Sequence, residues 1–206
     1  MTTKGTMVRL WGTGLAAAVL VAACSIPPEM MGEQLAGPAV FQELPPPGFG
    51  TLRQNEVSIS LTSGDLRLMV TPLAESVTLV TAPDTYQRLS RLAASYGASA
   101  GNPNLFLVSF FSEHPDARFV PEEVQLLSRG VRVRPAEIRA ITPTWGERRV
   151  GQLETEMAIY SFEGTVDLES EITLVYGLDQ TAVWSVIRTR IQAERARAHG
   201  RSRGNS

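Results

Sequence analysis

Hydrophobic and polar residues alternate strictly over two segments that follow the N-terminal quarter of the chain. Aliphatic side chains occupy every second position of 56–62 and, after the turn-forming residues 62–65, of 66–70. A period of two is typical of strands with one buried face. The sequence therefore predicts an antiparallel hairpin over these segments. The apolar, β-branched run 77–81 predicts a third strand.

A helical period replaces the alternation between residues 83 and 96. Thr81-Ala82-Pro83-Asp84 has the spacing of a capping box with a proline in the first turn, and Gly97 is placed to end a helix. The apolar residues between them recur three or four positions apart and share one face: Tyr86, Leu89, Leu92, Ala93 and Tyr96. We expect one helix, about 83–96, inserted between strands and packed on a sheet.

The remaining apolar runs are short and separated by turn residues, as in an all-β domain. The run 105–111 is apolar on both faces and predicts a central strand, and 124–127 and 131–133 flank the turn Ser128-Arg129-Gly130. Two more strands are expected at 157–162 and 172–176. About eight short strands at this spacing predict a mainly β fold, a β-sandwich with the inserted helix.

The C-terminal segment predicts a second helix, about 180–198, capped by Asp179. An apolar stripe (Val183, Trp184, Ile187, Ile191) gives way to arginine and alanine, so we expect the first half to dock and the second half to be solvated. Arginines near a helix C-terminus suit the helix dipole. Residues beyond this helix are expected to form a basic, disordered tail.

One hairpin carries a resemblance to a known family. Phe119-Val120-Pro121-Glu122-Glu123-Val124 is followed by Ser128-Arg129-Gly130-Val131 and then by Arg134-Pro135. This run resembles the hairpin of telokin-like immunoglobulin domains of bacterial surface lipoproteins, over about 20 of the 206 residues. The resemblance implies an immunoglobulin-like sandwich and carries no catalytic residues.

The first 23 residues have the pattern of an export signal. Lys4 and Arg9 give a positive start without acidic residues, and residues 10–23 are small and apolar. This apolar stretch is shorter than the roughly 20 residues that a membrane-spanning helix needs. The pattern therefore predicts a signal peptide, residues 1–23, and an exported protein.

The signal ends in Val21-Ala22-Ala23-Cys24, and Cys24 is the only cysteine of the chain. This motif resembles the lipobox of bacterial lipoproteins, which implies cleavage between Ala23 and Cys24 and a lipid-anchored, palmitate-type modification of the Cys24 sulfur. Ser25, in place of an aspartate, favours the outer membrane in that family. The alternative is an ordinary secretory signal that is cleaved after Ala23.

Composition divides the rest of the chain into three parts. Residues 25–50 hold six of the 13 prolines and predict a Pro/Gly-rich tether over 24–52. The β-sandwich domain is expected over 53–178, and the C-terminal helix and basic tail over 179–206. A chain of 206 residues has room for one domain with a core.

Charge is unevenly distributed along the chain. Residues 188–206 carry six arginines and one glutamate, whereas 24–187 carry a net charge of −9. The basic segment, with Arg195 and Arg197, is a candidate contact for an envelope protein or an anionic envelope polymer; a solvated helix end is the alternative. Export argues against nucleic acid.

The segment Gly97-Ala98-Ser99-Ala100-Gly101 matches the G-x-S-x-G motif of serine hydrolases. A nucleophile elbow needs a strand before its serine and a helix after it, and here the predicted order is reversed. His114 and His199 are the only histidines, and His199 lies in the expected tail. A small-residue loop that ends a helix explains the motif more simply.

No other pattern predicts catalysis. Glu113, His114 and Asp116 lack the spacing of a metal site, so neither a metal nor a cofactor is expected. Trp145 lies in a turn-rich segment, where its indole is a candidate ligand contact or folds over the core.

Together these patterns predict a non-enzymatic, lipid-anchored cell-envelope protein that serves as a binding or assembly module. The alternatives are an envelope serine hydrolase that uses Ser99 and a purely structural outer-membrane lipoprotein.

Overall fold

The alternating segments at the start of the body form the predicted hairpin. The computed structural model describes residues 43–97 and 104–204, which belong to one unit, Gln42–Ser206. In it β1 (Ile59–Ser63) pairs antiparallel with β2 (Leu66–Pro72), and Leu61 lies opposite Leu68. Their aliphatic side chains are buried. The period of two therefore identified both the strands and the buried face.

A five-stranded antiparallel sheet is built on this hairpin, in the order β1-β2-β3-β9-β7. β3 (Leu105–Ser112) is central, as predicted, and is buried on both faces. β9 (Thr155–Phe162) was also expected, whereas β7 (Pro135–Ala140) was not. β7 is an edge strand of mostly exposed residues, so it lacks the apolar run by which the others were recognised.

The second sheet has four strands, in the order β11-β10-β5-β6. The hairpin of β5 (Val124–Ser128) and β6 (Val131–Val133) and the strand β10 (Ile172–Tyr176) confirm the predicted segments. β11 (Asp179–Thr181) was not predicted. A third, two-stranded sheet joins β4 (Ala117–Arg118) to β8 (Arg149–Val150).

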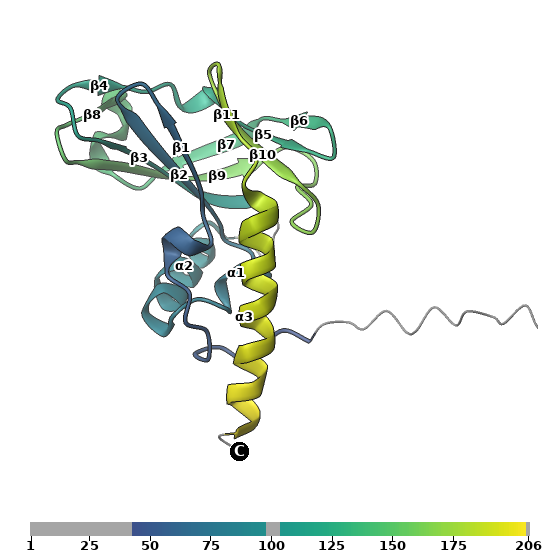
Figure 1. Ribbon diagram of the computed structural model, residues 1–206. Coiled ribbons are helices and arrows are strands. Elements are labelled where there is room, and N and C mark those ends of the chain that lie inside the picture. Colours follow the sequence, from purple (N-terminus) through teal and green to yellow (C-terminus); the bar gives the residue numbers. More distant parts are fainter. Residues whose placement is uncertain (1–42, 98–103, 205–206) are drawn as a thin grey trace, which may run out of the picture. The chain divides into compact units, whose positions relative to one another are not determined.

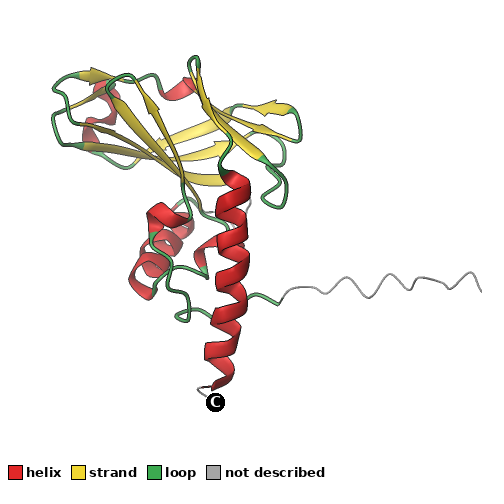
Figure 2. Ribbon diagram, in the orientation of Figure 1, coloured by secondary structure: helices red, strands yellow, loops and turns green. Residues whose placement is uncertain are grey.

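The two larger sheets share one core, so the arrangement is consistent with a β-sandwich and the chain is mainly β (Figures 1 and 2). Aromatic rings from both sheets and from the loops meet there. Phe110 of β3 stacks on Phe119 with ring centroids 4.6 Å apart. The ring centroid of Tyr176 of β10 lies 5.6 Å from that of Phe110.

The inserted helix is present as α2 (Pro83–Ser95). Leu89 is fully buried against Leu105 and Leu107 of β3 and Ile159 of β9, so α2 covers part of the outer face of the five-stranded sheet. The expected capping box is not formed. The Thr81 hydroxyl donates instead to the carbonyl oxygen of Thr78 at 2.7 Å, and Pro83 begins the helix without a side-chain cap.

The predicted strand 77–81 is wrong. Residues Glu75–Thr78 form the short helix α1, and Val77, Thr78 and Val80 are buried. A run of apolar and β-branched residues can be buried in a helix as well as in a strand. Here the run 77–81 is apolar because it is buried, although it is not a strand. Within residues 43–97 and 104–204, three short 3-10 helices lie in the connections: η2 (Gln54–Glu56), η3 (Pro121–Glu123) and η4 (Pro143–Glu147).

The C-terminal helix, α3 (Trp184–Gly204), starts later and ends later than the predicted range 180–198. Asp179 does not cap it, because Asp179 pairs with Tyr176 in the β10–β11 hairpin. The segment expected to be a disordered tail is helical as far as Gly204. The buried Trp184 anchors the helix, and its Nε1 donates to the Leu168 carbonyl oxygen at 2.9 Å. Figure 2 shows α3 running away from the sheets.

The last ten residues assigned to the tether belong to the body. Pro45, Gly50 and Leu52 are buried. Leu52 donates to the Val80 carbonyl oxygen at 3.2 Å and accepts from the Ala82 amide at 2.8 Å. Glycine is required at position 50, because an added Cβ would lie 2.2 Å from the Val80 carbonyl carbon. This glycine permits close backbone contact rather than flexibility.

We expect Gly50→Ala to lower the free energy of unfolding by about 1–3 kcal/mol, because the new methyl group overlaps the Val80 backbone. Gly146→Ala is the matched control, since its Cβ would meet nothing within 4 Å. Urea unfolding followed by circular dichroism measures both variants. Equal stabilities of the two variants would contradict the close approach at Gly50.

Candidate functional site

The second half of α3 binds the segment through which the chain enters the body. We call the contacts between α3 and residues 43–56 the α3 seam. At its centre Glu194 is only 2% exposed, and its carboxylate accepts hydrogen bonds from the Thr51 amide at 3.1 Å and the Thr51 hydroxyl at 2.8 Å. The Arg201 guanidinium forms an ion pair with the same carboxylate. The buried charge is thus paired and hydrogen-bonded.

Other side chains of α3 extend the seam in both directions. Arg201 also donates to the Phe49 carbonyl oxygen, at 2.9 Å from Nε and 2.6 Å from Nη2. The His199 ring is hydrogen-bonded to the Glu43 carbonyl oxygen. Arg190 donates to the carbonyl oxygen of Glu56 at 3.0 Å. These bonds satisfy backbone carbonyls of an irregular segment that has few partners of its own.

The Glu194 carboxyl has a shifted pKa. Burial by itself raises this pKa, but the hydrogen bonds from the Thr51 hydroxyl and from Arg201, together with the Arg201 charge, outweigh burial and hold the pKa below its usual range. Glu194 is therefore ionised at neutral pH, and its charge stabilises the folded state.

The two arginines predicted as ligand contacts have different environments. Arg195 is 8% exposed, and its Nη2 donates to the Ser76 carbonyl oxygen at 3.0 Å, so it links α3 to α1. The side chain of Arg197 is 67% exposed, with Nη1 3.5 Å from the Glu194 carboxylate. Arg197 is available to a partner at the surface, whereas Arg195 is part of the body.

Trp145 lies in the core rather than at the surface. It is 8% exposed, and its ring centroid lies 4.9 Å from that of Phe119 and 5.8 Å from that of Phe110. The indole therefore covers one end of the aromatic core, which corrects its prediction as a candidate ligand contact. The turn-rich sequence around it is the 3-10 helix η4, which folds the ring inward.

The other predicted site residues lie outside the described residues, namely Ala23 and Cys24 of the lipobox and Ser99 of the G-x-S-x-G motif. Of the two histidines, His114 follows the end of β3. His199 lies on α3 in the seam.

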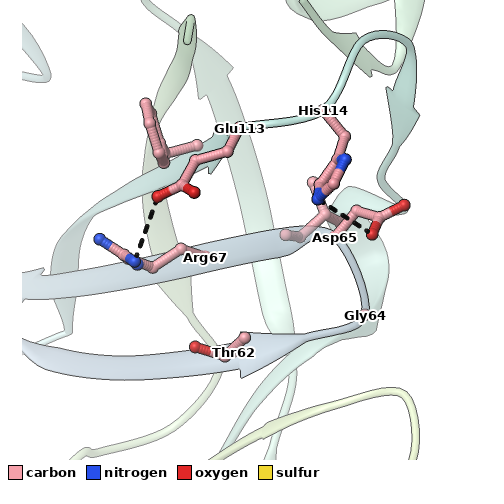
Figure 3. A pocket seen from close by; sticks show the side chains of 8 residues that line it. Thr62, Gly64, Asp65, Arg67, Glu113 and His114 are labelled. Carbon is pink, nitrogen blue, oxygen red and sulfur yellow. Dashed lines mark ion pairs between the residues drawn. The ribbon is translucent and has the colours of Figure 1, made fainter. Parts of the chain in front are cut away.

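A small polar hollow lies beside the β1–β2 turn (Figure 3). His114 Nε2 lies 3.8 Å from Asp65 Oδ1, and Arg67 Nη2 lies 3.6 Å from Glu113 Oε1. All four side chains are more than half exposed. Exposed ion pairs of this kind contribute about 0–1 kcal/mol to stability. Within the described ranges no three metal-ligating side chains form a cluster.

A larger groove lies on the outer face of the five-stranded sheet, where α2 leaves it open. Two cross-strand rows form its floor: Ser60, Met69, Ser109 and Met157 in one, and Arg67, Phe111 and Thr155 in the other. With Gln54 and Asn55 at the rim, it encloses about 500 Å³. That volume is within the range of small-molecule sites. We call it the sheet-face groove.

Sequence reasoning missed both the seam and the groove. Glu194 is the one acid among the arginines of the C-terminal segment. A single acid in a basic segment is a signal for a carboxylate that is buried and paired. Met69 of β2 and Met157 of β9 both face outward, because they alternate with inward-facing residues along their strands. Only the strand register shows that the two methionines share a cross-strand row.

No protein-family model, curated protein or solved structure matches this chain. Among the described helices, none is both long and apolar enough to cross a membrane.

We predict that Glu194→Gln lowers the free energy of unfolding at pH 7 by about 1–3 kcal/mol, because Arg201 loses its buried charged partner. The carboxyl pKa is depressed in the folded state, so its stabilisation is present above the unfolded pKa of about 4.3 and disappears as pH falls through the folded pKa.

Urea unfolding between pH 7 and pH 2 measures this difference. The stability curves of the wild type and of Glu194→Gln should converge in acid. Glu113→Gln serves as the control, since the Glu113 carboxylate is 64% exposed in its ion pair. A constant gap between wild type and Glu194→Gln at all pH values would contradict a titrating seam.

Proposed function

We propose that this chain is a non-enzymatic, lipid-anchored protein of the bacterial cell envelope, in which an immunoglobulin-like β-sandwich serves as a binding or assembly module. The observation that carries the proposal is the sequence Val21-Ala22-Ala23-Cys24 at the end of an export signal. Ser25 favours the outer membrane as its location. A cysteine acylated at this position holds the protein to the membrane through more than one acyl chain, which gives stable anchoring.

The ordered start of the body supports a short linkage to that anchor. Because the α3 seam holds residues 43–56, only residues 25–42 separate Cys24 from the body. The proposed anchor is therefore separated from the start of the body by 18 residues.

The sheet-face groove supports a binding role. Its floor combines thioether and aromatic side chains with hydroxyls and one guanidinium, and Arg67 lies 5.9 Å from the Phe111 ring centroid. Small-molecule sites typically have such an apolar floor with a few polar groups that orient the ligand. Methionine side chains adapt to ligands of different shapes.

Cys24→Ala is the direct test of the anchor. In cells fed a labelled palmitate analogue, the wild type should become labelled and float with membranes, because its thiol is the acylation site. The Cys24→Ala chain should remain an unlabelled precursor. Ser25→Ala is the matched control and should be labelled like the wild type. Equal labelling of the wild type and Cys24→Ala would overturn the proposal.

A fluorophosphonate probe separates the binding module from the hydrolase alternative. We expect no labelling of the purified wild-type chain, since an unactivated serine does not react with this probe. A serine esterase of known activity provides the positive control. Labelling of the wild type that disappears in Ser99→Ala would favour the hydrolase and contradict the non-enzymatic proposal.

A further inference from the structure

The charge of the body is segregated between α3 and everything that precedes it. The 21 residues of α3 include six arginines and a single acid, Glu194. Residues 43–183 carry 18 acidic residues and 11 arginines, a net charge of −7. An anionic surface therefore attracts α3 and repels the rest of the body.

Three of the six arginines lie in the last eight residues of α3 and reach solvent. The side chain of Arg197 is 67% exposed and that of Arg201 is 39% exposed, and Arg203 is also exposed. Among the described residues, Glu194, which is buried in the seam, and Glu43, which is exposed, are acids near this end. We call Arg197, Arg201 and Arg203 the basic end of α3.

The chain leaves the body toward Cys24 at this same end. The Glu43 carbonyl oxygen is hydrogen-bonded to the His199 ring, and the Phe49 carbonyl oxygen accepts from Arg201. Figure 1 shows the end of α3 on the side of the body opposite to the tip of the β10–β11 hairpin. An anchor attached at this end of the body therefore favours contact of the lipid surface with the basic end rather than with the sheets.

We infer that the basic end of α3 docks on anionic phosphate headgroups of the membrane in which Cys24 is anchored, and that this contact orients the body with its sheets away from the lipid. The inference rests on the proposed lipid anchor. Each arginine near an anionic surface raises the ratio of docked to undocked protein about fivefold, and the attraction acts within a Debye length of about 8 Å.

Labelled cysteines report this orientation in the full lipidated protein. Because acylation consumes the Cys24 sulfur, an introduced cysteine is the reactive thiol of the chain. Gly204→Cys marks the basic end, where an added Cβ meets nothing within 4 Å. Leu178→Cys marks the fully exposed tip of the β10–β11 hairpin. Each is labelled with a fluorophore and placed in vesicles that carry a headgroup quencher.

The expected result is stronger quenching at position 204 in phosphatidylglycerol vesicles than in phosphatidylcholine vesicles, with no difference at position 178. Raising the salt concentration to about 0.5 M should remove the difference, as expected for screened charges. Equal quenching at 204 in both vesicle types would overturn the inference. A protein that floats with neither vesicle type would instead refute the anchor, so the two failures are distinguishable.

Charge substitutions give an independent test. Arg197→Gln combined with Arg203→Gln should reduce the docked-to-undocked ratio on phosphatidylglycerol roughly 25-fold while leaving Arg201 in the seam. Arg118→Gln with Arg149→Gln removes the same charge from exposed positions of β4 and β8 and should leave the ratio unchanged. Circular dichroism confirms that both variants are folded. An equal loss in both pairs, or a loss in neither, would overturn the inference.

Discussion

Burial of β3 on both faces is the constraint on which the described fold depends. Phe106, Val108 and Phe110 point into the core that the two larger sheets share, while Leu105 and Leu107 lie under α2. Apolar side chains of β3 thus face both the shared core and α2, so both layers must be present before this apolar surface leaves water. Burial of β3 therefore requires both the second sheet and α2. The sheet-face groove is the part of the outer face that α2 does not reach.

Short-range patterns predicted the elements that bury a regular stripe of side chains. The β1–β2 hairpin, the β5–β6 hairpin, β3 and α2 all follow from periods that operate within ten residues. The run 77–81 failed because its burial comes from a neighbouring segment and not from strand pairing. β7 and β11 were missed since edge strands need few apolar residues. The start of α3 was misplaced because a turn aspartate and a capping aspartate look alike in sequence.

The candidate sites were less predictable than the fold, since they depend on residues far apart in the chain. Prolines and glycines at 45–50 favoured a linker, yet Gly50 is needed for contact with Val80, and Thr51 bonds a glutamate 143 residues later. Nothing in the local sequence distinguishes Arg195, which holds α1, from the exposed Arg197. Trp145 lies in a turn-rich segment of the sequence, yet the single helical turn η4 places it in the core.

The α3 seam joins the first and last described parts of the chain, and this fixes the order in which the body is completed. A polypeptide emerges from its N-terminus, so Thr51 has no partner until Glu194 has followed. Closing a loop of this length costs conformational entropy that only the finished contact repays. The strands of both larger sheets end by Thr181, before α3 begins, so during synthesis the seam residues of α3 are the last of these elements to become available. A chain that ends before Glu194 lacks the carboxylate that accepts from Thr51, so residues 43–56 lose the centre of the seam and become accessible to proteolysis.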